Sequence, residues 1–252
     1  ITSTNSFIAS TNCILMTGAK PILCDIKPED GNIDISSTDE KADAIIPVHI
    51  YGNPCDFDSI RRMSEESKIP IIEDACQAHG AKYFDKKVGS LGDVGCFSFY
   101  PTKNMTVGGD GGMITTNNEE IQNEVISLRD NGRKSHTTHD KLGFTMRLNT
   151  VNAAIGRIQL GHLDERNSRR QKIAELYKKH LSEDYFLIEN PNGSSVFHQI
   201  IFRHKKRDDI MEHLSKNGIG TTIHYPIPIH KQPLYSYLNL TLSISEEFSN
   251  QV

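Results

Sequence analysis

The sequence predicts an α/β fold, in which a mostly parallel sheet is flanked by helices. Over roughly the first 120 residues, short runs of β-branched and apolar residues alternate with helical stretches. A repeated strand–helix–strand order requires right-handed crossovers, which place helices on both faces of a parallel sheet. The chain has 252 residues, so it can bury a core in one large domain or two ordinary ones.

The expected strands of the first half are short apolar runs that end in polar residues or glycine. The chain opens on a segment typical of a loop that leads into a helix, and another helix is expected over residues 56–70. The strands are expected at residues 14–26, 42–52, 71–75, 96–100 and 112–117.

The second half changes character at Asn149. Residues 149–181 contain no proline and keep helical spacing, which predicts one or two long helices. Their basic run, Arg166–Lys172, is either an anion site or a solvated helix face, and the solvated face is favoured. Further on, we expect strands at 194–204 and 219–225 with a helix between them that ends at Gly218. This pattern predicts a large α/β domain over residues 1–148, and a connecting helix with a small C-terminal α/β domain over 149–252.

Both ends of the chain look cut. The sequence begins without Met, and it stops soon after Ser243 and Glu246, which predict a capping box for a helix that has hardly begun. We therefore expect these residues to belong to a longer protein, truncated here at both ends.

Composition excludes several classes of function. The net charge of −4 comes from interspersed acids and bases, which argues against binding to nucleic acid or to an anionic membrane. The longest apolar runs are too short to span a membrane. Five scattered cysteines without CxxC spacing predict reduced thiols of a cytoplasmic protein, and neither a metal site nor a disulfide framework.

Two expected strands end in residues that can do chemistry. One ends at Asp74 and the next at Ser98, and Lys103 follows five residues later, before the Gly-rich loop GGDGG. Ligands of such sheets collect at the carboxyl ends of strands. A carboxylate, a hydroxyl and one lysine are what a protein needs to hold pyridoxal phosphate, which requires an anion at its ring nitrogen, donors at its phosphate and an amine. The alternative is that Asp74 only caps a helix.

These segments resemble the DegT/DnrJ/EryC1/StrS family, the sugar aminotransferases of fold type I among pyridoxal-phosphate enzymes. The resemblance rests on IIEDACQAHGA and VGCFSFYPTKNMTVGGDGGMI, with GAKPILCDIKPEDGNID, IIPVHIYGNPCDFDSI, LRDNGR, GFTMRLNTVNAAIGRIQL and IHYPIPIHKQPLY in family order. It covers nearly the whole chain, and it implies that the large domain binds the cofactor.

The resemblance implies a role for each residue of the cofactor site. Lys103 would form the Schiff base and then move a proton as general acid–base. Asp74 would pair with the pyridinium nitrogen, Gln77 would lie near the 3-oxygen of the ring, and Ser98 would hydrogen-bond the phosphate. Phe7 matches the family's ring-stacking aromatic, although a phenylalanine of the core is the alternative.

The family's sugar-nucleotide loop matches His224, Tyr225 and His230, for which an ordinary polar loop is the alternative. The chain also departs from the family pattern. Thr145 stands where the family has an Asn that reaches the phosphate of the neighbouring subunit, and Asp110 replaces the Glu of GEGG. The resemblance therefore implies a homodimer, and it places the family's Gly-Thr phosphate turn before residue 1.

The sequence predicts an aminotransferase that moves an amino group, from glutamate, to a nucleotide-linked keto-deoxysugar, as in polysaccharide biosynthesis. One alternative is a dehydratase or lyase of the same family. The family's dehydratases lack the Schiff-base lysine, and this chain has Lys103. The other alternative is a non-enzymatic regulator that keeps the fold, against which Asp74, Gln77, Ser98 and Lys103 together argue.

Overall fold

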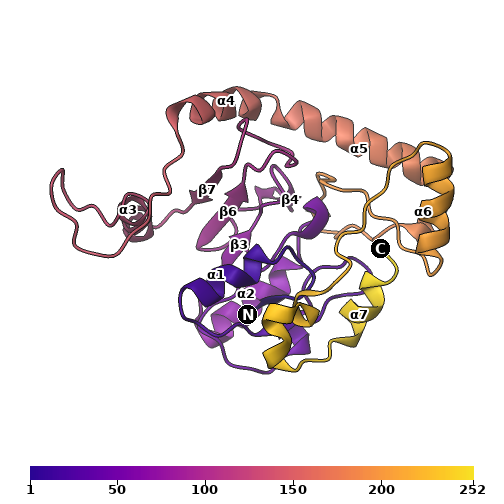
Figure 1. The fold of residues 1–252 in the computed structure, drawn as a ribbon, viewed down its shortest axis with the longest axis horizontal. Coiled ribbons are helices and arrows are strands. Elements are labelled where there is room, and N and C mark those ends of the chain that lie inside the picture. The colour runs from indigo at the N-terminus through magenta and orange to yellow at the C-terminus, as the bar shows by residue number, and fades with distance from the viewer.

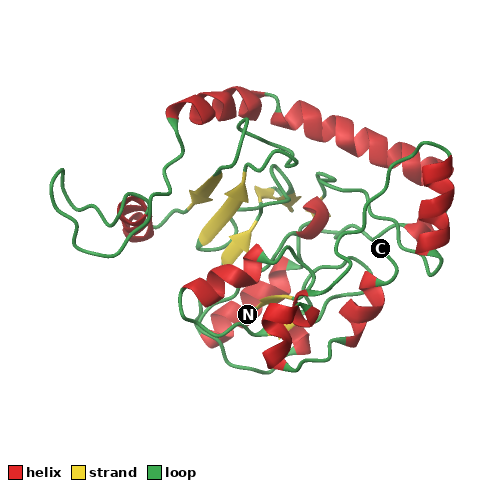
Figure 2. Ribbon diagram, in the orientation of Figure 1, coloured by secondary structure: helices red, strands yellow, loops and turns green.

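A computed structural model describes residues 1–252, apart from the side chain of Glu183. The fold is a mixed α/β structure with a mostly parallel central sheet, as the sequence predicts (Figure 1, Figure 2). Helices α4 and α5 run end to end along one side of the molecule, with α6 beyond them. Helices α1, α2 and α7 gather around the N-terminus on the opposite side of the sheet region.

The central sheet is assembled from short strands. Strand β1 (Thr2–Ser3) pairs in parallel with β2 (Leu23–Cys24), and β3 (Ile72–Asp74) pairs in parallel with β6 (Val94–Ser98). Parallel bridges at residues 45–48 join the two pairs. Strand β7 (Gly112–Thr115) pairs with β6 in the antiparallel direction and forms the edge of the sheet. The order is therefore β2, β1, residues 45–48, β3, β6 and β7.

A second, antiparallel sheet contains only two-residue strands. Strand β4 (Lys82–Tyr83) lies between β5 (Lys86–Lys87) and β8 (Gly193–Ser194). Because β8 comes from the second half of the chain, this sheet ties the two predicted domains together.

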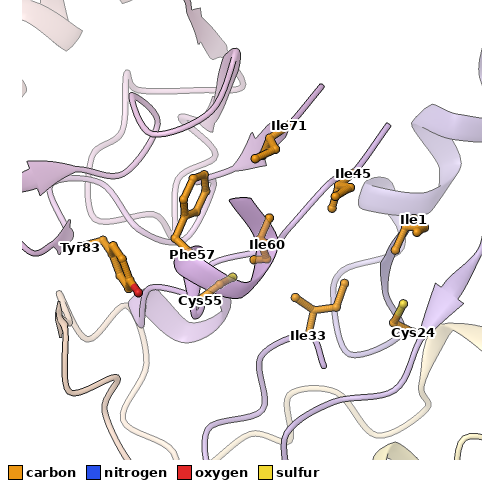
Figure 3. Close-up of a cluster of buried hydrophobic side chains, with 9 residues drawn as sticks. All are labelled: Ile1, Cys24, Ile33, Ile45, Cys55, Phe57, Ile60, Ile71 and Tyr83. Carbon is orange, nitrogen blue, oxygen red and sulfur yellow. The ribbon is translucent and has the colours of Figure 1, made fainter. Parts of the chain in front are cut away.

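Helix α2 (Phe57–Ser67) shows how the body is held together. Asp56 caps its first turn by accepting from the backbone N–H of Ser59, and Lys68 ends the helix in the left-handed conformation. The buried face of α2 packs on the sheet in the cluster drawn in Figure 3, where side chains from the strands and from α2 converge. The cluster contains Ile1, Cys24, Ile33, Ile45, Cys55, Phe57, Ile60, Ile71 and Tyr83.

The sequence predicts one or two long helices in the second half, and the structure has two, α4 (Thr150–Gly161) and α5 (Leu163–His180), which meet at His162. Asn149 caps α4 by accepting from the N–H of Asn152. The segment 129–149, which we call the arm, joins α3 (Glu119–Leu128) to α4 and extends away from the sheet (Figure 1). In the basic run of α5, most arginine and lysine side chains face solvent, as expected.

The two strands expected in the small domain do not form. In residues 194–204, the N–H of Val196 bonds the carbonyl of Gly52 and that of Gln199 bonds the carbonyl of Tyr51. The segment therefore follows loops of the first domain instead of pairing in a sheet, and only Gly193–Ser194 forms a strand. Residues 219–225 are likewise not a strand. Helix α6 (Arg207–Lys216) does form, and Gly218 follows it with a left-handed φ of 77°.

The C-terminal helix α7 (Ser243–Ser249) starts differently from the expected capping box. Leu242 is its N-cap, and the N–H groups of Ile244 and Ser245 are satisfied by the carboxylate of Asp25. Glu246 does reach back, to the N–H of Leu242. The cap is therefore supplied by a distant residue, and α7 packs against the first domain. The remaining helices are α1 (Ala9–Met16) and the short 3-10 turns Ile35–Ser37, Ile50–Gly52, Glu183–Tyr185, Ile229–Lys231 and Pro233–Leu238.

Candidate active site

The carboxyl ends of β3 and β6 bring Asp74 and Ser98 to one edge of the sheet. Asp74 lies opposite Cys96 in the parallel register, two residues before Ser98. The Oδ1 atom of Asp74 accepts from the N–H of Cys76 at 3.1 Å, and Oδ2 accepts from the hydroxyl of Ser10 at 2.7 Å. Turns and not a helix follow β3, so the helix-cap alternative for Asp74 is wrong.

Lys103 lies in the loop after β6, and its amine is half-buried. No hydrogen bond or ion pair to its Nζ atom occurs among the residues whose side chains the structure describes. Burial lowers the pKa of Lys103, and electrostatic interactions with Cys76 and Asp74 oppose this shift. A lysine with a lowered pKa has a larger fraction of neutral, nucleophilic amine. The hydroxyl of Ser98, which is also half-buried, accepts from the N–H of Tyr100 at 3.3 Å.

The residue after the lysine, Asn104, holds this loop against the second half of the chain. Its Nδ2 atom donates to Asn167 on α5 and to the carbonyl of Val196, both at 3.0 Å. Since Nδ2 is thereby identified as the amide nitrogen, Oδ1 accepts from Nδ1 of His198 at 3.2 Å. Burial, followed by the positive charge of Lys103, lowers the pKa of His198 to about 3. The imidazole is therefore neutral, and its Nε2 atom is an acceptor.

Gln77 lies in a turn, and both ends of its amide are fixed. Its Oε1 atom accepts from the N–H of Tyr51 at 2.6 Å, and its Nε2 atom donates to the hydroxyl of Tyr225 at 3.0 Å. Tyr51 has a left-handed φ of 59°, which is rare for a bulky residue. Burial raises the pKa of Tyr225 to about 12, with Gln77 opposing this shift and Asp74 adding to it.

Phe7 precedes α1 and is 57% exposed, so the alternative of a core phenylalanine is wrong. Its ring centroid lies 6.4 Å from that of Tyr225. Tyr225 thus contacts Gln77 and Phe7, and its pKa responds to the charge of Asp74. The structure brings these residues to one place.

His224 and His230 lie in different surroundings. The carbonyl of His224 accepts from the hydroxyl of Tyr51 at 2.7 Å, and burial followed by the charge of Lys103 lowers the pKa of its half-buried ring. His230 is buried, with Nδ1 2.7 Å from the hydroxyl of Thr4 and Nε2 3.1 Å from a carboxylate oxygen of Glu246. Both nitrogens of His230 are therefore engaged within the chain, and its substrate contact stays a prediction.

Thr145 lies on the exposed arm, which the structure does not bring to Asp74 and Lys103 of the same chain (Figure 1). Its hydroxyl donates to Asn131 at 3.0 Å. Asp110 is exposed.

Sequence reasoning missed Ser10, Asn104 and His198. Ser10 stands in the segment SFIAST that carries Phe7, and Asn104 follows Lys103 directly. A polar residue within an apolar segment is the signal that would have found Ser10. Within the described residues, no group of three or more histidine, cysteine, aspartate and glutamate side chains could hold a metal ion. No described helix is both long and apolar enough to span a membrane.

The family model of the DegT/DnrJ/EryC1/StrS aminotransferases matches residues 1–252. The chain belongs to this family. A "pleiotropic regulatory protein" of Geobacillus stearothermophilus is 40% identical over 94% of this chain and 66% of its own length. The dTDP-3-amino-3,6-dideoxy-alpha-D-galactopyranose transaminase of Aneurinibacillus thermoaerophilus is 40% identical over 100% of this chain and 71% of its own length.

Solved structures of the family share this fold. The structure of DesV of S. venezuelae in complex with a ketimine intermediate matches with a TM-score of 0.94 and 33% identity. The match covers 99% of this chain and 71% of DesV. The predicted fold class, that of the fold type I aminotransferases, is thereby confirmed. The chain spans about two thirds of the length of the curated relatives that it matches.

Proposed function

We propose that this chain forms part of a pyridoxal-phosphate-dependent aminotransferase that moves an amino group, from glutamate, to a keto carbon of a nucleotide-linked deoxysugar. The observation that carries this proposal is the half-buried amine of Lys103. It has a lowered pKa and no described partner, and its pKa responds to the charge of Asp74. The set of donors fits the cofactor, because it offers one anion, one hydroxyl and one reactive amine at a single sheet edge.

Each residue of the set would bind or orient one part of the cofactor, which supplies an electron sink for the substrate carbanion when bound. Asp74 would accept a hydrogen bond from the protonated ring nitrogen, and Ser98 would donate to the phosphate. Phe7 would cover one face of the ring. Lys103 would bond the cofactor aldehyde and later hold and move the proton at the substrate carbon.

Gln77 and Tyr225 would act together at the 3-oxygen of the ring. Nε2 of Gln77 uses one hydrogen on Tyr225 and has a second to donate, and the phenol that accepts this bond keeps its own hydrogen. His224 and Tyr225 would contact the sugar nucleotide, and the same role is proposed for His230. Residues 1–148 would form the cofactor domain, and residues 149–252 would form the connecting helices and part of a small domain.

The enzyme would be a homodimer, in which the arm of one subunit brings Thr145 to the cofactor phosphate of the other. Support comes from the exposed apolar side chains of the arm and α4, among them Leu142, which is 86% exposed. A stable two-fold interface covers such a surface. All five cysteines are free, which supports a cytoplasmic location.

Two alternatives stay open. The similarity to a protein called a pleiotropic regulatory protein favours a regulator, and a dehydratase or lyase would use the same cofactor. An assay of the full-length protein distinguishes the proposed function from both alternatives. The protein is loaded with cofactor and mixed with ¹⁵N-glutamate and a panel of dTDP- and UDP-linked 3-keto sugars. We expect glutamate to shift the visible absorbance band and ¹⁵N to appear in the sugar. Loss of water without ¹⁵N indicates a dehydratase or lyase, and an unresponsive band indicates a regulator.

A further inference from the structure

A chain of two hydroxyl groups leads from the start of α1 to the carboxylate of Asp74. The Oγ atom of Ser10 donates to Oδ2 of Asp74 at 2.7 Å, and the Oγ atom of Ser6 lies 2.7 Å from Oγ of Ser10. The two serines are only 6% and 5% exposed, respectively. Buried hydroxyl groups need hydrogen-bond partners, and Ser6 has one while Ser10 has two.

The direction of the chain follows from a count of protons. A hydroxyl carries one hydrogen, and a carboxylate oxygen can only accept. Ser10 uses its hydrogen on Asp74, so it must accept the bond that joins it to Ser6. The order of donation is therefore from Ser6 to Ser10 to Asp74. Hydrogen bonds in such a row polarise one another, so the second hydroxyl strengthens the donation of the first.

Helix α1 does not need these hydroxyls for its own start. Its N-cap is Ile8, and no side chain caps its first turn. Ser10 also points to a strand 64 residues away in the sequence. The contact therefore serves the packing of α1 on β3, the position of the Asp74 carboxylate, or both.

The geometry at Asp74 favours the second role. One oxygen is held by the N–H of Cys76 and the other by Ser10, so the carboxylate cannot rotate without breaking a bond. Ser6 is followed directly by Phe7, which is proposed to cover the cofactor ring. The same short segment therefore carries Phe7, which is proposed to cover the ring, and the two serines that hold the Asp74 carboxylate.

We propose that Ser10, backed by Ser6, is a positioning residue that fixes the Asp74 carboxylate in the orientation in which it binds the ring nitrogen of the cofactor. This inference rests on the proposed function. It adds that α1 sets the orientation of the Asp74 carboxylate together with β3, the strand that carries it.

The test uses the full-length protein with Ser10→Ala, Ser10→Thr and Ser6→Ala, and with Thr17→Ala as the matched control. Thr17 is an exposed hydroxyl at the end of the same helix, and it bonds only the local carbonyl of Ile14. Measured quantities are the dissociation constant of the cofactor, the pH midpoint of its absorbance band, kcat, the KM for glutamate and Tm.

We expect Ser10→Ala to weaken cofactor binding and to lower kcat about tenfold each, because one hydrogen bond to a charged group is lost. The pH midpoint of the band should move, while the KM for glutamate stays within twofold. Ser10→Thr should restore most of the loss, and Ser6→Ala should show a smaller loss. Adding Ser6→Ala to Ser10→Ala should cost nothing more, since Ser6 acts only through Ser10. Thr17→Ala should match the wild type.

A lowered Tm with unchanged kcat and pH midpoint would show that Ser10 only packs α1, and would overturn the inference. If Ser10→Ala does not fold, Ser6→Ala decides by the same readouts. If the wild type binds no cofactor, the proposed function fails. The inference is then decided by high-resolution structures of the cofactor-free wild type and Ser10→Ala, in which an unmoved Asp74 carboxylate refutes it.

Discussion

The edge of the sheet at Asp74 and the arm with α4 are built in opposite ways. At the sheet edge, polar side chains are buried or half-buried and bonded within the chain, as in the contacts of Asp74, Gln77 and Asn104. In the arm and α4, large apolar side chains lie in solvent, and Val151 is 70% exposed. The first region makes its hydrogen bonds within this chain. The other presents a surface that only a second surface can bury.

The difference separates the two tasks that the proposed function requires. The sheet edge would position the amine of Lys103, and the arm would contribute to assembly. Burial inside the body lowers the pKa of Lys103, which increases the fraction of neutral amine. The arm does not bury Lys103 of its own chain. Under the proposed function, it contributes Thr145 to the site of the neighbouring subunit. Mutations at the sheet edge should therefore change chemistry and stability, and mutations in the arm should change assembly.

The largest effect is expected for Lys103→Ala. In the full-length protein it should abolish covalent attachment of the cofactor and lower kcat by about 10⁴-fold, the upper range for a general acid–base group. The fold should persist, because burial penalises the charged lysine. Lys86→Ala on β5 is the control, since Lys86 is exposed. Borohydride reduction followed by peptide mapping checks the attachment, and a label on another lysine contradicts the assignment.

The next largest effect is expected for Asp74→Asn, which removes the charge but keeps the shape. The variant should still bind cofactor, and kcat should fall by about 10³-fold because a preorganised electrostatic contact is lost. Steady-state kinetics and a cofactor titration measure the two effects separately. Asp110→Asn in the exposed Gly-rich loop is the control. Near-normal turnover would mean that Asp74 serves only to accept hydrogen bonds from Ser10 and from the N–H of Cys76.

Substitutions in the buried layer beneath the site should lower the free energy of unfolding as strongly as substitutions in the site lower the turnover rate. Glu73 is fully buried beside His49, and it accepts from the N–H groups of Gly89, Leu91 and Gly92. Burial alone would raise the pKa of Glu73, but the hydrogen bond and charge of His49, followed by the N–H groups of Gly92 and Gly89, outweigh it and hold the pKa below its ordinary value of 4.5. Glu73→Gln should cost about 3 kcal/mol of unfolding free energy at pH 7, measured by urea titration.

The same variant predicts a pH dependence with a definite sign. Since folding lowers the pKa of Glu73, its stabilising contribution is complete above pH 4.5 and is lost as the pH falls through the folded-state value. Unfolding free energies measured from pH 6 downwards should therefore fall more steeply in the wild type than in Glu73→Gln. The exposed substitution Glu65→Gln on α2 should leave the wild-type slope unchanged. Equal slopes in all three proteins would contradict the assignment.

The smallest effect concerns the arm. Met146→Glu places a charge on an exposed apolar position of the arm, and it should weaken the dimer of the full-length protein about tenfold, while the monomer stays folded. Analytical ultracentrifugation over a concentration series measures this change. Leu234→Glu, at an exposed position outside the arm, is the control. A fully active monomer would refute both the dimer and the cross-subunit role of Thr145.

By itself, the sequence determined the parallel α/β body, helix α2, the helical stretch that contains α4 and α5, and the family. These follow from local patterns: alternating apolar runs, the caps at Asp56 and Asn149, and residues 71–112 in family order. Asp74, Ser98 and Lys103 were predictable as a group because strand ends of a parallel sheet meet at one edge.

Only the tertiary structure decided which polar groups meet across long separations in sequence. It replaced two expected strands by loops, and in one of them the N–H groups of residues 196 and 199 bond carbonyls of residues 51–52 instead of a neighbouring strand. It capped α7 with Asp25 and placed Tyr225 on Gln77. It also placed the hydroxyl of Ser10 within hydrogen-bond distance of Asp74. The physical reason is that a hydrogen bond depends on position in space, and local patterns carry no information about partners some 60 to 220 residues away.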